Sequence, residues 1–502
     1  MASMKHHHVL VIGAGPSGIG AAIKLAEDGF DFAILEKGMS VGGTWRDNTY
    51  PGCACDVPSA LYSYSFEPNP EWTRAFAGQR EIRAYLENVA KKYDLPRHVR
   101  FGVEVLRAAF REGLWHVETN QGTYTANVVI SASGPWNQPK IPAIPGLETF
   151  AGEVFHSARW NHTHDLTGKR VAVVGSGASA VQFVPEIAKK VERLHLFQRT
   201  AQWVLPKPDH YVPASERWLM RTFPRAQRAL RRAEYLSQEA LGLGFRHPWI
   251  LQQVQRIGRR HLEATVADPV LRAKLTPDYT LGCKRILLSN SYYRSLTRPN
   301  VDVLATEVTK IDGHRVTGAD GSTVEVDTLI FGTGFHILDM PVANRIVDAE
   351  GKSLSDHWQG SPRAYLGTTV PGFPNFFLLL GPSLGTGHSS AFSILEAQLA
   401  YVLDGLRKMR AERLATVDVR AEVLDAYHAE VQEALGGTVY NSGGCSSYYL
   451  DRNGKNTFAW PWSTPALERR IHDFDLDAYE TTGITAVRSR SVSESRFEGR
   501  PS

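Results

Sequence analysis

The chain is poor in cysteine, with four in 502 residues. That is too few for the disulfide framework of a small secreted protein. Cys53 and Cys55 form C-x-C rather than the C-x-x-C of a redox or zinc site, and the spacing to Cys283 and Cys445 matches no zinc pattern. We therefore expect four free thiols, no metal site and a cytoplasmic protein.

Long apolar runs and a large excess of charge are also absent. No run is long enough to cross a membrane, and the first residues, MASMKHHH, lack the apolar region of a signal peptide. The formal net charge is only +4, so nothing indicates a nucleic-acid partner. A hydrophobic content of 43% and a charged content of 22% are typical of a globular protein of several domains.

Near the N-terminus, the sequence predicts a strand, a glycine turn, a helix and a second strand. Gly13, Gly15 and Gly18 form G-x-G-x-x-G directly after the apolar residues 9–12. In this motif the glycines allow the tight turn, the approach of a pyrophosphate and close packing of helix on strand. Glu36 ends the second strand, where a carboxylate binds a ribose diol and repels a 2′-phosphate. This unit is predicted to bind FAD or NAD.

A second unit of the same kind begins at residue 170. Its turn carries Gly175, Gly177 and Ala180. Arg199, followed by Thr200, stands where the first unit has its carboxylate. Because a guanidinium binds phosphate through paired hydrogen bonds, this unit is predicted to bind NADP(H).

The remaining segments complete both units. Residues 126–134, 326–335 and 376–380 are apolar strands that end in turns of small residues, and residues 213–277 have an Arg-rich helical pattern. This insert either covers a pocket or presents a basic amphipathic face to a membrane. We expect an α/β fold with two Rossmann-like dinucleotide-binding domains, for FAD (1–149 and 341–485) and NADPH (150–212 and 278–340), an inserted helical subdomain (213–277) and a disordered tail (486–502).

The segment that joins the two units has a recognisable pattern. Phe150, Gly152, His156 and Trp160 follow F-x-G-x-x-x-H-x-x-x-W, with Asn161 next. This resembles the fingerprint of type I Baeyer–Villiger monooxygenases, which are class B flavoprotein monooxygenases, although that family has Pro or Asp in the last place. The related flavin-containing monooxygenases have Phe or Tyr in place of Trp160.

Two further segments are similar to the same family. Residues 42–59 resemble its flavin-contacting segment, which here contains Gly43, Thr44, Trp45 and Asp56. Residues 281–293 resemble the segment with its active-site arginine, here Arg285, next to Lys284 as a second NADP phosphate contact.

The resemblance implies an NADPH-dependent flavin monooxygenase. With FAD and NADPH, such an enzyme inserts one oxygen atom of O2 into a ketone C–C bond through a C4a-peroxyflavin and gives an ester or lactone. Arg285 would stabilise the negative charges of this reaction, Asp56 would hold Arg285, and the fingerprint would couple the two domains.

Alternatives remain at this stage. Asp56 and Arg285 could form a structural ion pair, and the same site could oxidise sulfur or nitrogen atoms. A flavin disulfide reductase is disfavoured because it needs a C-x-x-C, and an NADPH oxidase is less favoured. Four aromatic residues could line the pocket or belong to the core: Tyr292, Tyr293, Trp460 and Trp462.

Overall fold

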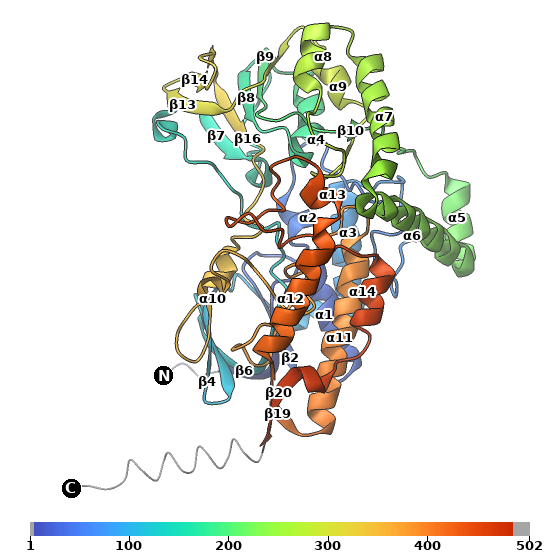
Figure 1. The fold of residues 1–502 in the computed structure, drawn as a ribbon, viewed down its shortest axis with the longest axis vertical. Helices are drawn as coiled ribbons and strands as arrows, with labels where there is room; N and C mark the ends of the chain where they lie inside the picture. Colours follow the sequence, from blue (N-terminus) through green and yellow to red (C-terminus); the bar gives the residue numbers. More distant parts are fainter. Residues whose placement is uncertain (1–4, 485–502) are drawn as a thin grey trace, which may run out of the picture.

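The computed structural model describes residues 5–484 and is built on two large sheets, one below the other in Figure 1: the first is mixed and the second is parallel. The predicted tail lies outside the described residues. The first sheet has eight strands in the order β17-β4-β5-β6-β1-β2-β3, with β18 paired to β6. Its strands are β1 (Lys5–Ile12), β2 (Phe32–Glu36), β3 (Val99–Phe101), β4 (Val105–Arg111), β5 (Leu114–Thr119), β6 (Gly122–Ser131), β17 (Ile346–Val347) and β18 (Phe376–Leu378).

The alternation of side chains along β1 explains how this sheet is covered. Val9 and Val11 face one core, which is formed with α1 (Pro16–Glu27), α3 (Gln79–Lys92) and α11 (Ala391–Ala411). Leu10 and Ile12 face the opposite core, which is formed with β4, β5 and α10 (Leu354–Trp358). Because both faces are covered, the strand is a continuous apolar run.

The second sheet has five strands in the order β12-β9-β8-β16-β7. They are β7 (Glu153–His156), β8 (Arg170–Val174), β9 (Arg193–Phe197), β12 (Val301–Leu304) and β16 (Thr328–Phe331). The helices α4 (Ala178–Ile187) and α9 (Tyr292–Leu296) cover one face. A three-stranded sheet of β13 (Val308–Asp312), β14 (Arg315–Gly318) and β15 (Thr323–Glu325) covers the other. Two Rossmann-like units therefore make up the body, as expected.

Between β9 and β12 the chain forms a helical arm of α5 (Ala214–Thr222), α6 (Pro224–Arg246), α7 (Pro248–Thr265) and α8 (Pro269–Leu275). Proline opens α6, α7 and α8, where its missing N–H is not needed. Figure 1 shows α5 and the start of α6 projecting from the body. Arg231 anchors α6 to the first unit by donating to the carbonyls of Ala60 and Ser63. Within residues 5–484, no helix is long and apolar enough to cross a membrane.

The other helices, strands and 3-10 turns complete the described chain. They are α2 (Thr44–Asp47), α12 (Ala421–Gly436), α13 (Val439–Ser442), α14 (Thr464–Arg470), β10 (Val204–Leu205), β11 (Leu287–Leu288), β19 (Leu414–Val419) and β20 (Tyr479–Gly483), and the 3-10 turns η1 (Leu95–His98), η2 (Leu147–Thr149), η3 (Ser157–Arg159), η4 (Pro341–Asn344) and η5 (Leu476–Ala478).

One prediction about the cysteines was wrong. Cys283 and Cys445 form a disulfide, with their Cα atoms 6.1 Å apart. They are separated by 162 positions, and sequence spacing carries no information about such a distant contact. Cys53 and Cys55 are free thiols. Burial raises the pKa of Cys53 to about 12 and also raises that of Cys55, so both stay protonated at neutral pH.

Asp418 on β19 provides a test of stability against pH. Its carboxylate accepts hydrogen bonds from the N–H of Gly372 at 3.1 Å, but burial raises its pKa to about 7. The folded state therefore favours the neutral carboxyl, and the free energy of unfolding falls as the pH rises from roughly 4 to about 7. Asp418→Asn removes this loss, so we expect a higher melting temperature than wild type at pH 8.

The measurement is thermal unfolding of both proteins at pH 5 and pH 8. The advantage of Asp418→Asn should be small at pH 5 and larger at pH 8. Glu433→Gln, at an exposed carboxylate of α12, is the control and should show no such difference. An equal effect of Asp418→Asn at both pH values would contradict the prediction.

Candidate active site

The structure has two adjoining cavities, a smaller one along the first unit and a larger one between the two units. The smaller has a volume of about 220 Å³ and is lined by Gly13, Gly15, Glu36, Gly43 and Thr44. The larger has a volume of about 770 Å³ and is lined by residues of both units, among them Asp56, Gly175, Arg199, Lys284 and Arg285. Thr44, Trp45, Tyr62 and Trp136 line both cavities. A ligand in the smaller cavity would thus reach the larger one.

The glycines of the first turn leave no room for side chains. Gly13 has φ +104°, and a Cβ there would lie 2.8 Å from the carbonyl oxygen of Ala132. A Cβ on Gly43 would lie 2.8 Å from the Cα of Gly15. The bare backbone at the N-terminus of α1 therefore forms a cradle that fits a pyrophosphate.

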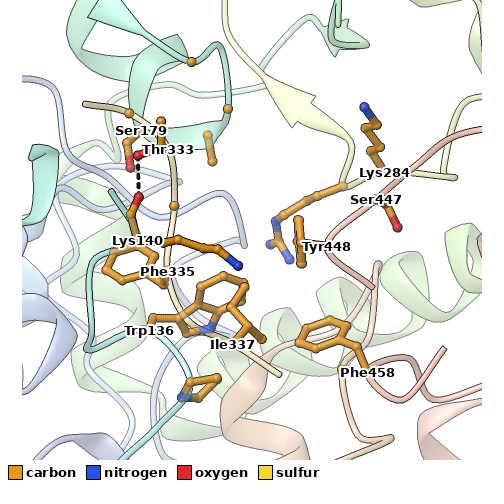
Figure 2. Close-up of a pocket in the computed structure, with 18 of the residues that line it drawn as sticks. Trp136, Lys140, Ser179, Lys284, Thr333, Phe335, Ile337, Ser447, Tyr448 and Phe458 are labelled. Carbon is orange, nitrogen blue, oxygen red and sulfur yellow. Dashed lines mark hydrogen bonds between the residues drawn. The ribbon is translucent and has the colours of Figure 1, made fainter. Parts of the chain in front are cut away.

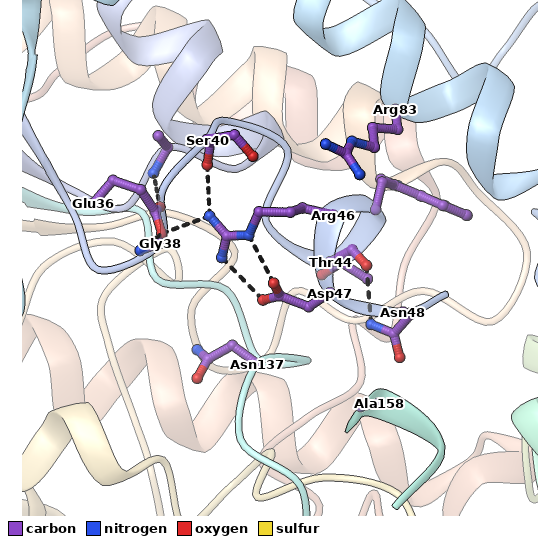
Figure 3. Close-up of polar contacts among 12 residues, drawn as sticks. Glu36, Gly38, Ser40, Thr44, Arg46, Asp47, Asn48, Arg83, Asn137 and Ala158 are labelled. Carbon is purple, nitrogen blue, oxygen red and sulfur yellow. Dashed lines mark hydrogen bonds and ion pairs between the residues drawn. The ribbon is translucent and has the colours of Figure 1, made fainter. Parts of the chain in front are cut away.

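Glu36 lies at the end of β2 and is buried (Figure 3). One carboxylate oxygen accepts from the N–H of Ala14 at 2.7 Å. The other accepts from the N–H of Gly38 at 2.6 Å and from Nη1 of Arg46 at 2.8 Å. Nε of Arg46 also donates to Asp47 at 2.7 Å. A carboxylate offers about four acceptor positions, so Glu36 keeps capacity for a ribose hydroxyl. Sequence reasoning did not assign a role to Arg46.

The second glycine turn borders the larger cavity. Gly175 has φ +101°, and a Cβ there would lie 2.6 Å from the carbonyl oxygen of Gly332. Gly177 precedes the first residue of α4, and Ala180 is fully buried against the sheet. This helix start fits a second pyrophosphate.

Cations gather at the same end of the larger cavity. The Arg199 side chain is 74% exposed and lies beside Thr200, and Lys284 lines the same cavity. Burial, followed by repulsion from Arg199, lowers the pKa of Lys284. Lys140, which sequence reasoning missed, points toward the open centre of the same cavity (Figure 2). Arg199 and Lys284 thus carry the charge and the N–H donors that can bind a phosphate dianion.

Asp56 and Arg285 meet in the wall of the larger cavity. Nε and Nη2 of Arg285 each donate to one oxygen of Asp56 at 2.8 Å. Asp56 raises the pKa of Arg285 far above its ordinary value. Burial alone would raise the pKa of Asp56, but Arg285 outweighs it and lowers that pKa. Both groups are therefore charged throughout the neutral range.

Lys207 supports this pair and was not identified from the sequence. Its Nζ donates to the carbonyl of Cys55 at 2.9 Å, directly before Asp56. Burial lowers the pKa of Lys207, whereas nearby Asp209 partly offsets that effect. Lys207 comes from the loop after β10, so it links the second unit to the loop of Asp56.

Three aromatic side chains form a wall of the larger cavity, Trp136, Tyr448 and Phe458 (Figure 2). The ring of Trp136 lies 5.9 Å from that of Tyr448, and Tyr448 lies 5.7 Å from Phe458. On the other side, Nε1 of Trp45 donates to Tyr62 at 3.1 Å. The four aromatic residues left open above do not line this cavity but pack in the cores: Tyr292, Tyr293, Trp460 and Trp462.

The fingerprint segment lies outside the cavity lining. A Cβ on Gly152 would clash with Asp327, which explains glycine at the entry to β7. His156 is buried, and its Nδ1 accepts from the N–H of Ala158 at 3.1 Å. Burial lowers the pKa of His156 to about 4, so it is neutral at pH 7. Trp160 packs 5.3 Å from Phe183 of α4.

Phe150 packs 6.1 Å from the ring of His314, on the loop between β13 and β14. The fingerprint segment thus packs the edge strand β7 against α4 and against the loop between β13 and β14.

Comparisons with known proteins extend over nearly the whole chain. Residues 10–221 match the family model described as pyridine nucleotide-disulphide oxidoreductase. The chain is 49% identical to a Baeyer–Villiger monooxygenase of Streptomyces coelicolor, over 95% of this chain and 93% of that one. It is 45% identical to a Baeyer–Villiger monooxygenase of Pseudomonas aeruginosa, over 100% and 96%.

Solved structures are similar over a comparable length. A closed crystal structure of cyclohexanone monooxygenase has a TM-score of 0.85 at 26% identity and covers 96% of this chain and 100% of that one. An oxidized steroid monooxygenase bound to NADP has a TM-score of 0.82 at 29% identity, over 93% and 97%. A complex of OTEMO with FAD and NADP has a TM-score of 0.85 at 25% identity, over 96% and 100%.

Proposed function

The chain belongs to the Baeyer–Villiger monooxygenase family, and we propose that the Asp56–Arg285 pair is the centre at which it oxygenates a ketone. It is an FAD- and NADPH-dependent flavin monooxygenase that converts a ketone to an ester or lactone with O2. The observation that carries the proposal is the bidentate ion pair in the wall of the larger cavity, which both units line. When bound, NADPH supplies hydride, and FAD supplies activated oxygen from O2 to the substrate.

The glycine cradles support an assignment of the two cofactors to the two cavities. We propose that Gly13, Gly15, Gly18 and Glu36 hold the adenosine diphosphate part of FAD, with Gly43, Thr44, Trp45 and Asp56 along the rest of the group. Gly175, Gly177, Ala180, Arg199, Thr200 and Lys284 would hold NADPH. We also propose the division into FAD and NADPH domains at the boundaries expected above, which this assignment supports.

Arg285 has the geometry for anion stabilisation. Asp56 accepts hydrogen bonds from Nε and from one of the two N–H groups of Nη2. Nη1 is therefore left to donate into the cavity. A fixed guanidinium lowers the energy of a negatively charged oxygen donor and of the charge that develops on the attacked carbonyl oxygen. Asp56 holds the guanidinium of Arg285 in place, and Lys207 fixes the loop that carries Asp56.

The charge of Arg285 also decides between ketone and heteroatom oxidation. Oxidation of sulfur or nitrogen needs a neutral, electrophilic oxygen donor, whereas attack on a ketone carbonyl needs an anionic one. A permanent cation at the reacting position favours the anion. The aromatic wall formed by Trp136, Tyr448 and Phe458 would keep water from the oxygen donor.

The function is tested by incubating the FAD-loaded enzyme with NADPH and a ketone panel. We expect products one oxygen atom heavier than the ketones, with little H2O2. Sulfoxide from thioethers without any ester would favour heteroatom oxidation, and H2O2 alone would indicate an oxidase.

Two further expectations concern the surroundings of the protein. The absence of a nucleic-acid partner and a cytoplasmic location remain predictions. The cytoplasmic location was expected because all four cysteines were predicted to be free thiols, and the disulfide removes that argument.

Arg199 and Lys284 provide a test of the NADPH assignment. We expect Arg199→Ala and Lys284→Ala each to raise the KM for NADPH roughly 10- to 100-fold, the value of one charged hydrogen bond. The KM for NADH, which lacks the 2′-phosphate, should change far less. Steady-state kinetics with both cofactors measures this. Arg298→Ala, at an exposed position outside the cavity, is the control, and equal losses for NADPH and NADH would refute the assignment.

A further inference from the structure

The helical arm exposes an unusual number of large apolar side chains. Among the described residues, seven of fourteen exposed large hydrophobic side chains lie on α5–α7 and their turns: Trp218, Leu219, Phe223, Leu236, Leu243, Trp249 and Ile257. Trp218 is 53% exposed and Trp249 is 65% exposed. A concentration of exposed apolar side chains of this kind is typical of a surface that binds a partner protein or a membrane.

The same arm is also basic on its exposed side. Six arginines on α6 and α7 are exposed: Arg225, Arg228, Arg232, Arg256, Arg259 and Arg260. The ion pairs from the arm to the body use other arginines, Arg221 with Glu71 and Arg231 with Glu396. Of the acidic residues on α6 and α7, only Glu263 is exposed. The outward surface is therefore both apolar and cationic.

The arm is held firmly on its inner side. Glu234 accepts from the N–H of Leu61 at 3.0 Å, and Arg231, three positions earlier, donates to the carbonyls of Ala60 and Ser63. The spacing of three, four and seven positions places Arg225, Arg228, Arg232, Leu236 and Leu243 on the opposite face of α6. Since α5 and the start of α6 project from the body (Figure 1), a flat partner could reach them.

We propose that this arm surface, the seven apolar residues and six arginines named above, docks peripherally on an anionic lipid bilayer. Arginine pairs with lipid phosphates, while tryptophan, phenylalanine and leucine enter the boundary between headgroups and acyl chains. A second copy of the same surface would oppose six arginines to six, which disfavours a dimer. Nucleic acid would pair with the arginines but leave the apolar side chains uncovered.

The test is flotation of the full FAD-loaded chain with vesicles of phosphatidylcholine, alone or mixed with phosphatidylglycerol. We expect binding to the anionic vesicles only, weakened by high salt. Arg225→Gln/Arg228→Gln/Arg232→Gln should lower partitioning about 100-fold. Trp218→Ser/Trp249→Ser should lower it at low and high salt alike.

A matched control separates this surface from net charge. Arg111→Gln/Arg294→Gln/Arg298→Gln removes the same charge from exposed positions elsewhere and should leave binding unchanged. All variants should keep wild-type NADPH consumption with a water-soluble ketone, which shows that they fold. Absence of binding to anionic vesicles, or equal losses in both arginine variants, overturns the proposal. A dimer that Trp218→Ser/Trp249→Ser dissociates, without vesicle binding, overturns it in favour of self-association.

Discussion

Replacing Arg285 by alanine should abolish oxygenated product while NADPH still reduces the flavin. The variant loses the donor that stabilises the anionic oxygen and the developing charge on the carbonyl. Loss of one such donor lowers the rate roughly 10²- to 10³-fold. Hydride transfer does not use this donor, so flavin reduction should stay within a few-fold of wild type. Anaerobic stopped-flow reduction, product mass and H2O2 measure the three quantities.

Arg285→Lys refines this test. Lysine keeps the positive charge but cannot form the paired contact of Nε and Nη2 with Asp56. We expect partial activity at most, with more of the NADPH diverted to H2O2. If Arg285→Ala forms product within tenfold of wild type, Asp56 and Arg285 are a structural ion pair, and the proposed centre is wrong.

Replacing Glu36 by alanine should give a protein purified largely without FAD. The buried carboxylate orders Ala14, Gly38 and Arg46 around the first cradle, and all three lose their acceptor in the variant. A contact to a charged group is worth about 1.5–3 kcal/mol, so loss of the one ribose contact alone predicts a loss of FAD affinity of roughly 10- to 100-fold, and disorder of the cradle adds to it. Glu36→Gln keeps the shape and should retain intermediate affinity.

The measurement is FAD content after purification, followed by titration of the apoprotein with FAD. Glu104→Gln is the control, because Glu104 lines the same cavity but pairs with Arg345 at 2.7 Å. A circular dichroism spectrum like that of wild type would exclude global unfolding. Wild-type FAD affinity in Glu36→Ala would show that the first cradle is not the FAD site.

Local sequence patterns predicted the parts of the fold that depend on neighbouring residues. The turns at Gly13 and Gly175 need positive φ and close backbone contact, so their glycines and flanking apolar runs are readable from a few positions. The strands expected at 126–134 and 326–335 appear as β6 and β16, with ends shifted by a few residues. The helical insert could be predicted for the same reason, because a 3.6-residue periodicity depends only on residues close in the sequence.

Contacts between distant segments could not be predicted in this way. Arg46 and Lys207 acquire their roles from partners that only the folded chain brings near, and Tyr448 meets Trp136 from the far end of the sequence. The pairing of Asp56 with Arg285 came from the family resemblance, since nothing in either residue's own neighbourhood indicates the other. The coupling role expected for His156 stays a prediction, and its ring is buried at the end of β7.

The disulfide gives the backbone the topology of a closed ring with two tails. The ring runs from residue 283 to residue 445 and includes β12–β16, β18, α11 and α12, so it contains strands of both sheets. A protease that cuts once anywhere inside this ring breaks a peptide bond without releasing a fragment. The neighbours of the bridge, Arg285 on one side and Tyr448 on the other, then stay covalently connected through it even in the nicked chain.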